Sequence, residues 1–202
     1  MGSQLRPALV LLVALHVLTG VVYPLAVTGV AQVVWPANAG GSLVVVDGRT
    51  RGSRLIGQPF SAPAYFWGRP SATSPVPYDA SASSGSNLGP TNPALVDLVR
   101  ARIAALRAAD PSLTGPIPAD LVTASASGLD PDISVAAALV QVPRVARARG
   151  VSEASIRTLV EAHVVEPTLG LLGEPRVNVL LLNLALDAGS RSGPGGVRRP
   201  GV

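Results

Sequence analysis

Neither cysteine nor lysine occurs anywhere in the 202 residues of this sequence. Because there is no cysteine, the chain cannot form a disulfide, a zinc–thiolate site or a thiol nucleophile. Because there is no lysine, it cannot complete a Walker-type phosphate loop or a Ser-x-x-Lys catalytic pair. These absences leave few routes to catalysis, and we expect no catalytic residue.

Histidine is scarce as well, with only His16 and His163 in the chain. A serine nucleophile needs a base, and His16 lies in an apolar run, so only His163 could serve. His163 falls on the apolar side of a predicted helix, which favours a buried core histidine, and no Gly-x-Ser-x-Gly elbow is present. The two histidines lie on opposite sides of a predicted membrane boundary, so we expect no metal site.

Charge of either sign is almost absent from the N-terminal quarter of the chain. Residues 7–46 contain no Asp, Glu, Lys or Arg, and residues 8–34 are mostly Val, Leu and Ala. About 20 apolar residues suffice to cross a bilayer, so we predict a transmembrane helix at 8–34 behind a short cytoplasmic N-terminus at 1–7. A cleavable signal peptide with a site at 37–39 is the alternative. Its apolar region would be about 7–15 residues long, which favours the uncut anchor.

The rest of the chain carries a balanced charge. Residues 35–190 hold 12 arginines and 12 acidic residues, so the net charge of +4 comes from Arg6 and the C-terminal tail. A neutral domain argues against nucleic-acid binding. Arg6 on one side of the span and three arginines at 49–54 on the other leave the membrane orientation undecided.

Polar residues within the predicted span follow one side of the helix. His16, Thr19 and Tyr23 are spaced by three and four residues, and polar groups in hydrocarbon prefer a protein neighbour. His16 is the most telling of them, because ionisable residues in spans usually face protein or a cavity. We predict contacts with partner helices along this stripe, with scattered, merely tolerated polar residues as the alternative. Pro24 is expected to kink the helix.

Residues 35–188 have the size and patterning of one small mixed α/β domain, so the fold class is α+β with one N-terminal transmembrane helix. Asp47-Gly48 between two β-rich runs predicts a hairpin. Asn92-Pro93 begins a helix that reaches about residue 109, Pro143 should bend or divide a helix over 134–149, and Ser152 caps another. Residues 176–179 alternate like a strand, 180–187 continue as helix or strand, and 189–202 form a Gly/Pro/Arg tail that we expect to be disordered.

Two serine- and glycine-rich segments, 81–89 and 123–131, could present backbone N–H groups and hydroxyls to an anion. The same composition is typical of structural turns. Residues 60–67 hold four of the seven aromatic residues. Two further readings stay open: a membrane-anchored extracytoplasmic serine hydrolase with an exposed His163 beside a serine, and a solute-binding module with a deep polar pocket.

Nine short blocks match a known family in order. They cover residues 5–8, 23–25, 52–58, 65–73, 84–88, 121–130, 141–146, 177–179 and 182–186. Tyr65-Phe66-Trp67-Gly68-Arg69-Pro70 and the Val-Asn-Val of 177–179 are among them. Through these blocks the chain resembles the C subunit of the Kdp potassium-transporting ATPase from about residue 5 to 187.

The resemblance implies a non-catalytic accessory subunit of a high-affinity, ATP-driven potassium uptake complex in the bacterial inner membrane. It implies a single-pass chain with its domain on the extracytoplasmic side. Its partners would be a channel-like potassium-binding subunit, a phosphorylating ATPase subunit, a small stabilising subunit and membrane lipid. The chain would have no cofactor of its own, but would help assembly and promote ATP binding by the catalytic subunit through a transient complex with ATP.

The resemblance and the composition together give candidate site residues. Nucleotide or interface positions are Ser84, Gly85, Ser86, Asn87, Ser125, Ser127, Gly128 and Gln141. Tyr65, Phe66, Trp67 and Arg69 are expected at an interface, because aromatic residues and arginine are favoured there.

Overall fold

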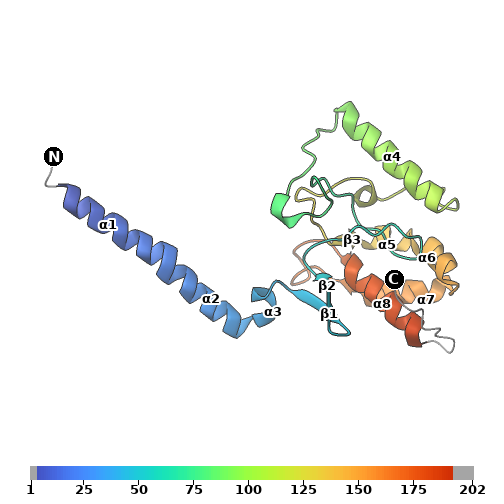
Figure 1. The fold of residues 1–202 in the computed structure, drawn as a ribbon. Helices are drawn as coiled ribbons and strands as arrows, with labels where there is room; N and C mark the ends of the chain where they lie inside the picture. Colours follow the sequence, from blue (N-terminus) through green and yellow to red (C-terminus); the bar gives the residue numbers. More distant parts are fainter. Residues whose placement is uncertain (1–3, 193–202) are drawn as a thin grey trace. The chain divides into compact units, whose positions relative to one another are not determined.

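The computed structural model describes residues 4–192, which fall into two units. We call Met1–Ser53 the anchor unit and Arg54–Val202 the domain. One apolar N-terminal helix, small sheets and several helices confirm the predicted α+β class (Figure 1). The division after Ser53 differs from the boundary expected at residue 35.

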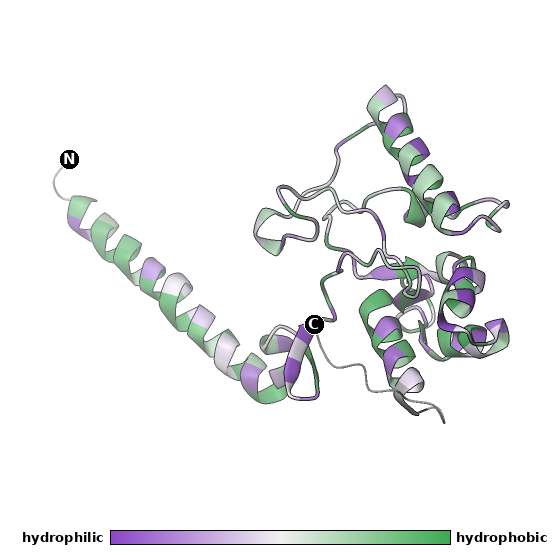
Figure 2. Ribbon diagram, turned by 45° about the vertical axis from the view of Figure 1, so that its right-hand side comes forward, coloured by the Kyte–Doolittle hydropathy of each residue, from purple (hydrophilic) through white to green (hydrophobic). Residues whose placement is uncertain are grey.

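The anchor unit begins with a helix of 30 residues, Leu5–Val34, which is long and apolar enough to cross a membrane. It is the one such helix among the described residues, and Figure 2 shows its predominantly hydrophobic colouring. It consists of α1 (Leu5–Val17), a π-helical turn (Leu18–Val22) and α2 (Tyr23–Val34). The wide turn lies directly before Pro24, where the N–H of Tyr23 donates to the carbonyl of Leu18. A proline ring clashes with the carbonyl four residues earlier, and the wide turn relieves that clash.

A short helix and a hairpin complete the anchor unit. After α3 (Pro36–Ala39), β1 (Leu43–Val46) pairs antiparallel with β2 (Arg49–Ser53). Asp47 and Gly48 both have positive φ, 53° and 72°, as a two-residue hairpin turn requires. The predicted Asp-Gly hairpin is therefore confirmed.

In the described part of the domain, residues 54–192, five helices combine with a three-stranded antiparallel sheet. Its elements are α4 (Pro93–Ala109), β3 (Asp132–Ser134), α5 (Val135–Leu139), α6 (Val142–Arg149), α7 (Glu153–Ala162), β4 (Val164–Val165), β5 (Arg176–Asn178) and α8 (Val179–Ser192). The strand order is β3-β5-β4. Two 3₁₀ turns, Ala80–Ala82 and Ala119–Leu121, lie in the long connections.

Local signals in the sequence set the helix ends. Asn92 accepts a hydrogen bond from the N–H of Ala94, and Ser152 accepts one from Ser155. The helix predicted over 134–149 is divided just before Pro143, and Gly150 ends it with φ 67°. These predictions are confirmed.

The core of the domain lies between the sheet and helices α5 to α8. Its largest fully buried apolar side chains are Phe66, Leu121, Ile133, Leu182, Val142, Val145, Val160 and Val177. Helix α4 has one buried residue, Leu106, which packs in the core. The helix stands apart from α5–α8 in Figure 1.

The C-terminal segment expected as strand or helix over 180–187 is helical. Helix α8 runs to Ser192 and so enters the tail expected from residue 189. The remainder of that tail, 193–202, lies outside the described residues.

Candidate functional site

The aromatic segment expected at an interface runs through the interior of the domain. Phe66 is 0% and Trp67 7% exposed, so both are core residues and the interface role predicted for them is wrong. The amide of Asn183 brackets Phe66, accepting from its N–H at 2.9 Å and donating to its carbonyl at 3.0 Å. Gln141 brackets Trp67 in the same way, at 2.8 and 3.1 Å. Buried backbone groups need such partners, and this segment belongs to no sheet that could supply them.

A buried arginine lies against the same segment. Arg144 donates to the carbonyls of Pro63 and Tyr65 at 2.6 and 3.0 Å, and its guanidinium carbon lies 4.5 Å from the centre of the Trp67 ring. Burial lowers the pKa of Arg144 to about 10, so the group stays charged at neutral pH. Carbonyl oxygens and a π face contact this charge directly, and the negative charge of Asp110 also favours it.

Tyr65 and Arg69, the other two predicted interface residues, are partly exposed. The Tyr65 hydroxyl donates to Asp187 at 3.0 Å, and Arg149 joins the same carboxylate at 2.8 Å. Burial, reinforced by the negative charge of Asp187, raises the pKa of the Tyr65 hydroxyl. The structure therefore leaves these two side chains within reach of a partner.

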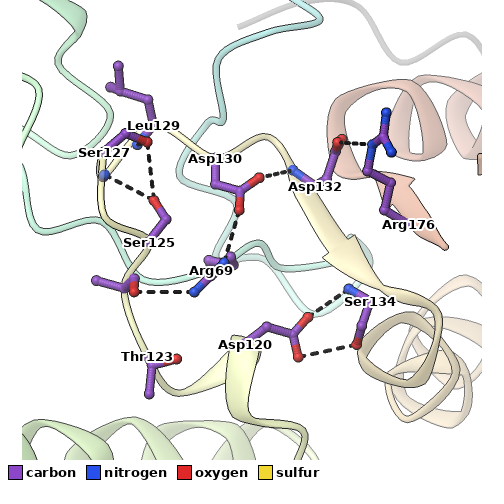
Figure 3. A network of polar contacts seen from close by, with 12 residues as sticks. Arg69, Asp120, Thr123, Ser125, Ser127, Leu129, Asp130, Asp132, Ser134 and Arg176 are labelled. Carbon is purple, nitrogen blue, oxygen red and sulfur yellow. Dashed lines mark hydrogen bonds and ion pairs between the residues drawn. The ribbon is translucent and has the colours of Figure 1, made fainter. Parts of the chain in front are cut away.

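Arg69 joins the aromatic segment to the second Ser-rich loop. It donates to Asp130 at 3.0 Å and to the carbonyl of Ala124 at 3.2 Å (Figure 3). Asp130 also accepts from the N–H of Asp132 at 3.0 Å. This network fixes the loop that contains the predicted Ser125, Ser127 and Gly128.

The two Ser-rich loops, far apart in the sequence, pack against each other. Ser83 donates to the carbonyl of Ser127 at 3.0 Å. A Cβ at Gly85 would lie 2.8 Å from the carbonyl oxygen of Ala126, and one at Gly128 would lie 2.7 Å from that of Ser84. Glycine is therefore required where the backbones cross.

The predicted nucleotide or interface positions separate into exposed and internal groups. Ser84, Ser86 and Asn87 are exposed. Ser125 is buried and accepts from the N–H of Gly128, while Ser127 accepts from Leu129. Gln141 is 3% exposed, and its side-chain amide is hydrogen-bonded to the backbone of Trp67. It therefore does not belong to a surface site with the serines.

A cavity of about 610 Å³ borders the Arg69 network. Its lining includes four carboxylates and two guanidiniums, namely Asp120, Asp130, Asp132, Glu174, Arg69 and Arg176. Burial raises the pKa of Asp132, although Asn178 and Arg176 bind its carboxylate at 2.9 and 3.0 Å. Within residues 4–192 no group of three or more His, Cys, Asp or Glu is placed to hold a metal ion.

Sequence reasoning missed this cavity. Asp120 and Asp130 stand ten positions apart in the chain, and Glu174 and Arg176 come from beyond β4. The one local signal was the Asp-Pro-Asp run of 130–132, which places two carboxylates at the start of β3.

His163 is the C-cap residue of α7 and is partly exposed, so it is not the fully buried core histidine that its position in the sequence predicted. Its Nδ1 lies 2.8 Å from the carbonyl of Leu159, and among residues 4–192 no hydrogen bond links it to a serine. The serine hydrolase alternative required a histidine in a cleft beside a serine. This geometry disfavours it.

His16, Thr19 and Tyr23, which we call the membrane stripe, are exposed along one side of the apolar helix. His16 Nδ1 lies 2.8 Å from the carbonyl of Leu12, and Thr19 donates to that of Leu15 at 2.7 Å. Tyr23 is 65% exposed. The polar groups of His16 and Thr19 thus have partners within the helix, and the stripe offers a surface for packing.

Comparison with known proteins extends over both units. A family described as "KdpC: K+-transporting ATPase, c chain" matches residues 5–188. The chain belongs to the KdpC family. A KdpC subunit of a potassium-transporting ATPase from Sorangium cellulosum is 66% identical over 187 residues, covering 93% of this chain and 98% of that protein. Proteins of the same name from Variovorax paradoxus and Dechloromonas aromatica are each 63% identical, covering 93% and 95% of this chain and 97% and 100% of their own lengths.

Membership of the KdpC family agrees with the resemblance found in the sequence blocks. The match begins at the start of the apolar helix and ends within α8. The helix and the domain therefore both belong to the family pattern.

Proposed function

We propose that this chain is a non-catalytic accessory subunit of an ATP-driven potassium uptake complex, anchored by its N-terminal helix. The main support for this proposal is the family match over residues 5–188, together with relatives named as KdpC subunits of potassium-transporting ATPases. The buried amides of Gln141 and Asn183 bind backbone groups of the domain itself, which supports a structural role for them in an accessory subunit. Lysine is absent, which excludes the Asp-Lys pair of a phosphorylating subunit.

The proposed partners are a channel-like potassium-binding subunit, a phosphorylating ATPase subunit and a small stabilising subunit in the bacterial inner membrane. The exposed stripe of His16, Thr19 and Tyr23 supports helix contacts within the bilayer. Membrane lipid would cover the rest of the helix.

The domain is proposed to lie on the extracytoplasmic side. A long neutral domain is compatible with export, because long domains cross largely regardless of charge. The chain has no cysteine, so Ser86→Cys would introduce a unique thiol on an exposed loop. A membrane-impermeant maleimide should label it in intact spheroplasts, and labelling only after lysis would place the domain in the cytoplasm.

The predicted joint binding of ATP with the catalytic subunit remains a separate proposal, confined to the exposed Ser84, Ser86 and Asn87. A photoreactive ATP analogue added to the purified complex tests it. Label on the 81–89 peptide of this chain would support direct contact. Label confined to the catalytic subunit would leave assembly as the only route by which this chain affects ATP binding.

Co-purification tests the subunit proposal. The tagged chain, extracted in mild detergent from membranes of potassium-starved cells, should carry a multi-span protein and a phosphorylating ATPase in constant ratio. A chain that is recovered alone would refute the proposal.

A further inference from the structure

The connection between β4 and β5 presents three leucines to solvent. Leu169, Leu171 and Leu172 are 87%, 85% and 64% exposed. No other large apolar side chain in the described part of the domain is as exposed. We call residues 166–174 the leucine loop.

The backbone of the leucine loop is held by its own hydrogen bonds. The N–H of Thr168 donates to the carbonyl of Leu172 at 2.9 Å, and the N–H of Leu172 donates back to Thr168 at 3.0 Å. Gly170 donates to Pro167 at 2.9 Å. Leu169 takes a φ of 58°, which side chains of its type rarely adopt. The leucines are thus fixed outward, and such preorganisation lowers the entropic cost of binding.

An exposed apolar cluster of this kind marks an interaction surface rather than a solvent-facing turn. The charged residues beside the leucine loop indicate which kind of partner it binds. Glu166 and Glu174 flank the leucines, and among residues 4–192 neither forms an ion pair or a side-chain hydrogen bond. Glu174 also borders the cavity, where four carboxylates outnumber the two guanidiniums of Arg69 and Arg176, so its lining carries net negative charge. This acidic surround repels an anionic lipid surface and favours a protein cleft with a basic rim.

We infer that the leucine loop inserts into an apolar cleft with a basic rim on another chain of the potassium-transporting complex. The inference rests on the proposed function and names a contact surface for it. This surface differs from the buried Phe66 and Trp67, which sequence reasoning had placed at an interface. The acidic cavity next to the loop would face the same partner.

A single cysteine tests the inference, because the native chain has none. Leu171→Cys would be compared with Leu98→Cys, whose leucine on α4 is also exposed, at 58%. A water-soluble maleimide should label Leu171→Cys at least tenfold more slowly in the assembled complex than in the isolated chain. The labelling rate of Leu98→Cys should stay within about twofold.

Cross-linking identifies what covers the loop. A benzophenone attached at Leu171→Cys should form an adduct with another protein chain of the complex, and one at Leu98→Cys should not. Equal labelling in the free and assembled states, or adducts only with lipid or a second copy of this chain, would overturn the inference.

Introducing a charge at the contact gives an independent readout. Leu171→Asp should reduce the amount of chain retained in the complex more than tenfold relative to Leu98→Asp, since burial of a leucine is lost. Equal retention would overturn the inference while leaving the subunit proposal intact. Failure of the unmodified chain to co-purify would overturn both.

Discussion

The side-chain amide of Gln141 pairs with both backbone groups of Trp67, as a neighbouring strand would. The N–H of Trp67 donates to Oε1 at 2.8 Å, and Nε2 donates to the Trp67 carbonyl at 3.1 Å. Asn183 from α8 does the same for Phe66. Two amides, one from the turn between α5 and α6 and one from α8, thus hold one extended segment in the core, where its backbone would otherwise lack partners.

Replacing either amide by leucine should destabilise the domain. Gln141→Leu or Asn183→Leu leaves a buried N–H and a buried carbonyl unpaired, at a cost of about 1–3 kcal/mol each. The expected loss in free energy of unfolding is therefore about 2–4 kcal/mol, once the added apolar contact is counted. Thermal unfolding of the full chain in detergent, followed by circular dichroism, measures it.

Gln32→Leu is the matched control, because Gln32 lies exposed in the membrane helix. It should leave the unfolding of the domain unchanged. Unfolding of Gln141→Leu at the wild-type temperature would contradict the role given to the amide pairs.

Where the two Ser-rich loops cross, the packing leaves no room for a side chain at Gly85 but leaves room for one at Gly89. A Cβ at Gly85 would press on the backbone of Ala126, whereas nothing lies within 4 Å of a Cβ at Gly89. Gly85→Ala should cost about 1–3 kcal/mol, or separate the loops, as overpacking does. Gly89→Ala should be neutral or slightly stabilising. Amide hydrogen exchange over 123–129 measures the difference, and equal protection in both variants would disprove the crossing.

The carboxylate of Asp110 at the end of α4 gives a pH test. Burial raises its pKa, but hydrogen bonds from Ser112 and Arg147 outweigh burial and hold the pKa below the ordinary 3.8. The folded state therefore binds fewer protons, so this stabilisation is present above pH 3.8 and lost as the pH falls through the folded pKa.

Asp110→Asn should lower the free energy of unfolding by about 1–3 kcal/mol at neutral pH, and the difference from wild type should shrink below pH 3.8. Denaturant unfolding across pH measures both. Asp97→Asn is the control, because the Asp97–Arg100 pair is exposed on the same helix and contributes little. A difference that stays constant with pH would contradict the assigned ionisation.

The membrane stripe predicts a helix contact within the complex. His16→Leu should reduce co-purification of the partner chains about threefold, which corresponds to roughly 0.6 kcal/mol for a polar contact between spans. Ala14→Leu, roughly 160° around the helix, should have no effect. Unchanged recovery of partners with His16→Leu would remove the stripe from the interface.

Short-range signals predicted much of this fold. The Asp47-Gly48 turn, the Asn92 and Ser152 caps, and the Gly150 stop act within a few residues, so the sequence around each suffices. The three-stranded sheet was not predicted in full. Val164–Val165 has two residues, too few to show an alternating pattern.

The site was harder to predict, because its members meet across long stretches of chain. Trp67 and Gln141 are 74 residues apart, and Phe66 and Asn183 are 117 apart. The sequence analysis placed the aromatic residues beside Arg69 at an interface and Gln141 at a nucleotide or interface position. The apolar neighbours Val140 and Val142 were the one signal that Gln141 faces the core.

Omission and return of this chain in the purified potassium-transporting complex tests the central claim most directly. Potassium-stimulated ATP hydrolysis would be measured for the complex made without the chain, and again after the full-length chain is added back. The account predicts loss of stimulated hydrolysis without it and recovery on its return. Equal potassium-stimulated hydrolysis with and without the chain would contradict the account.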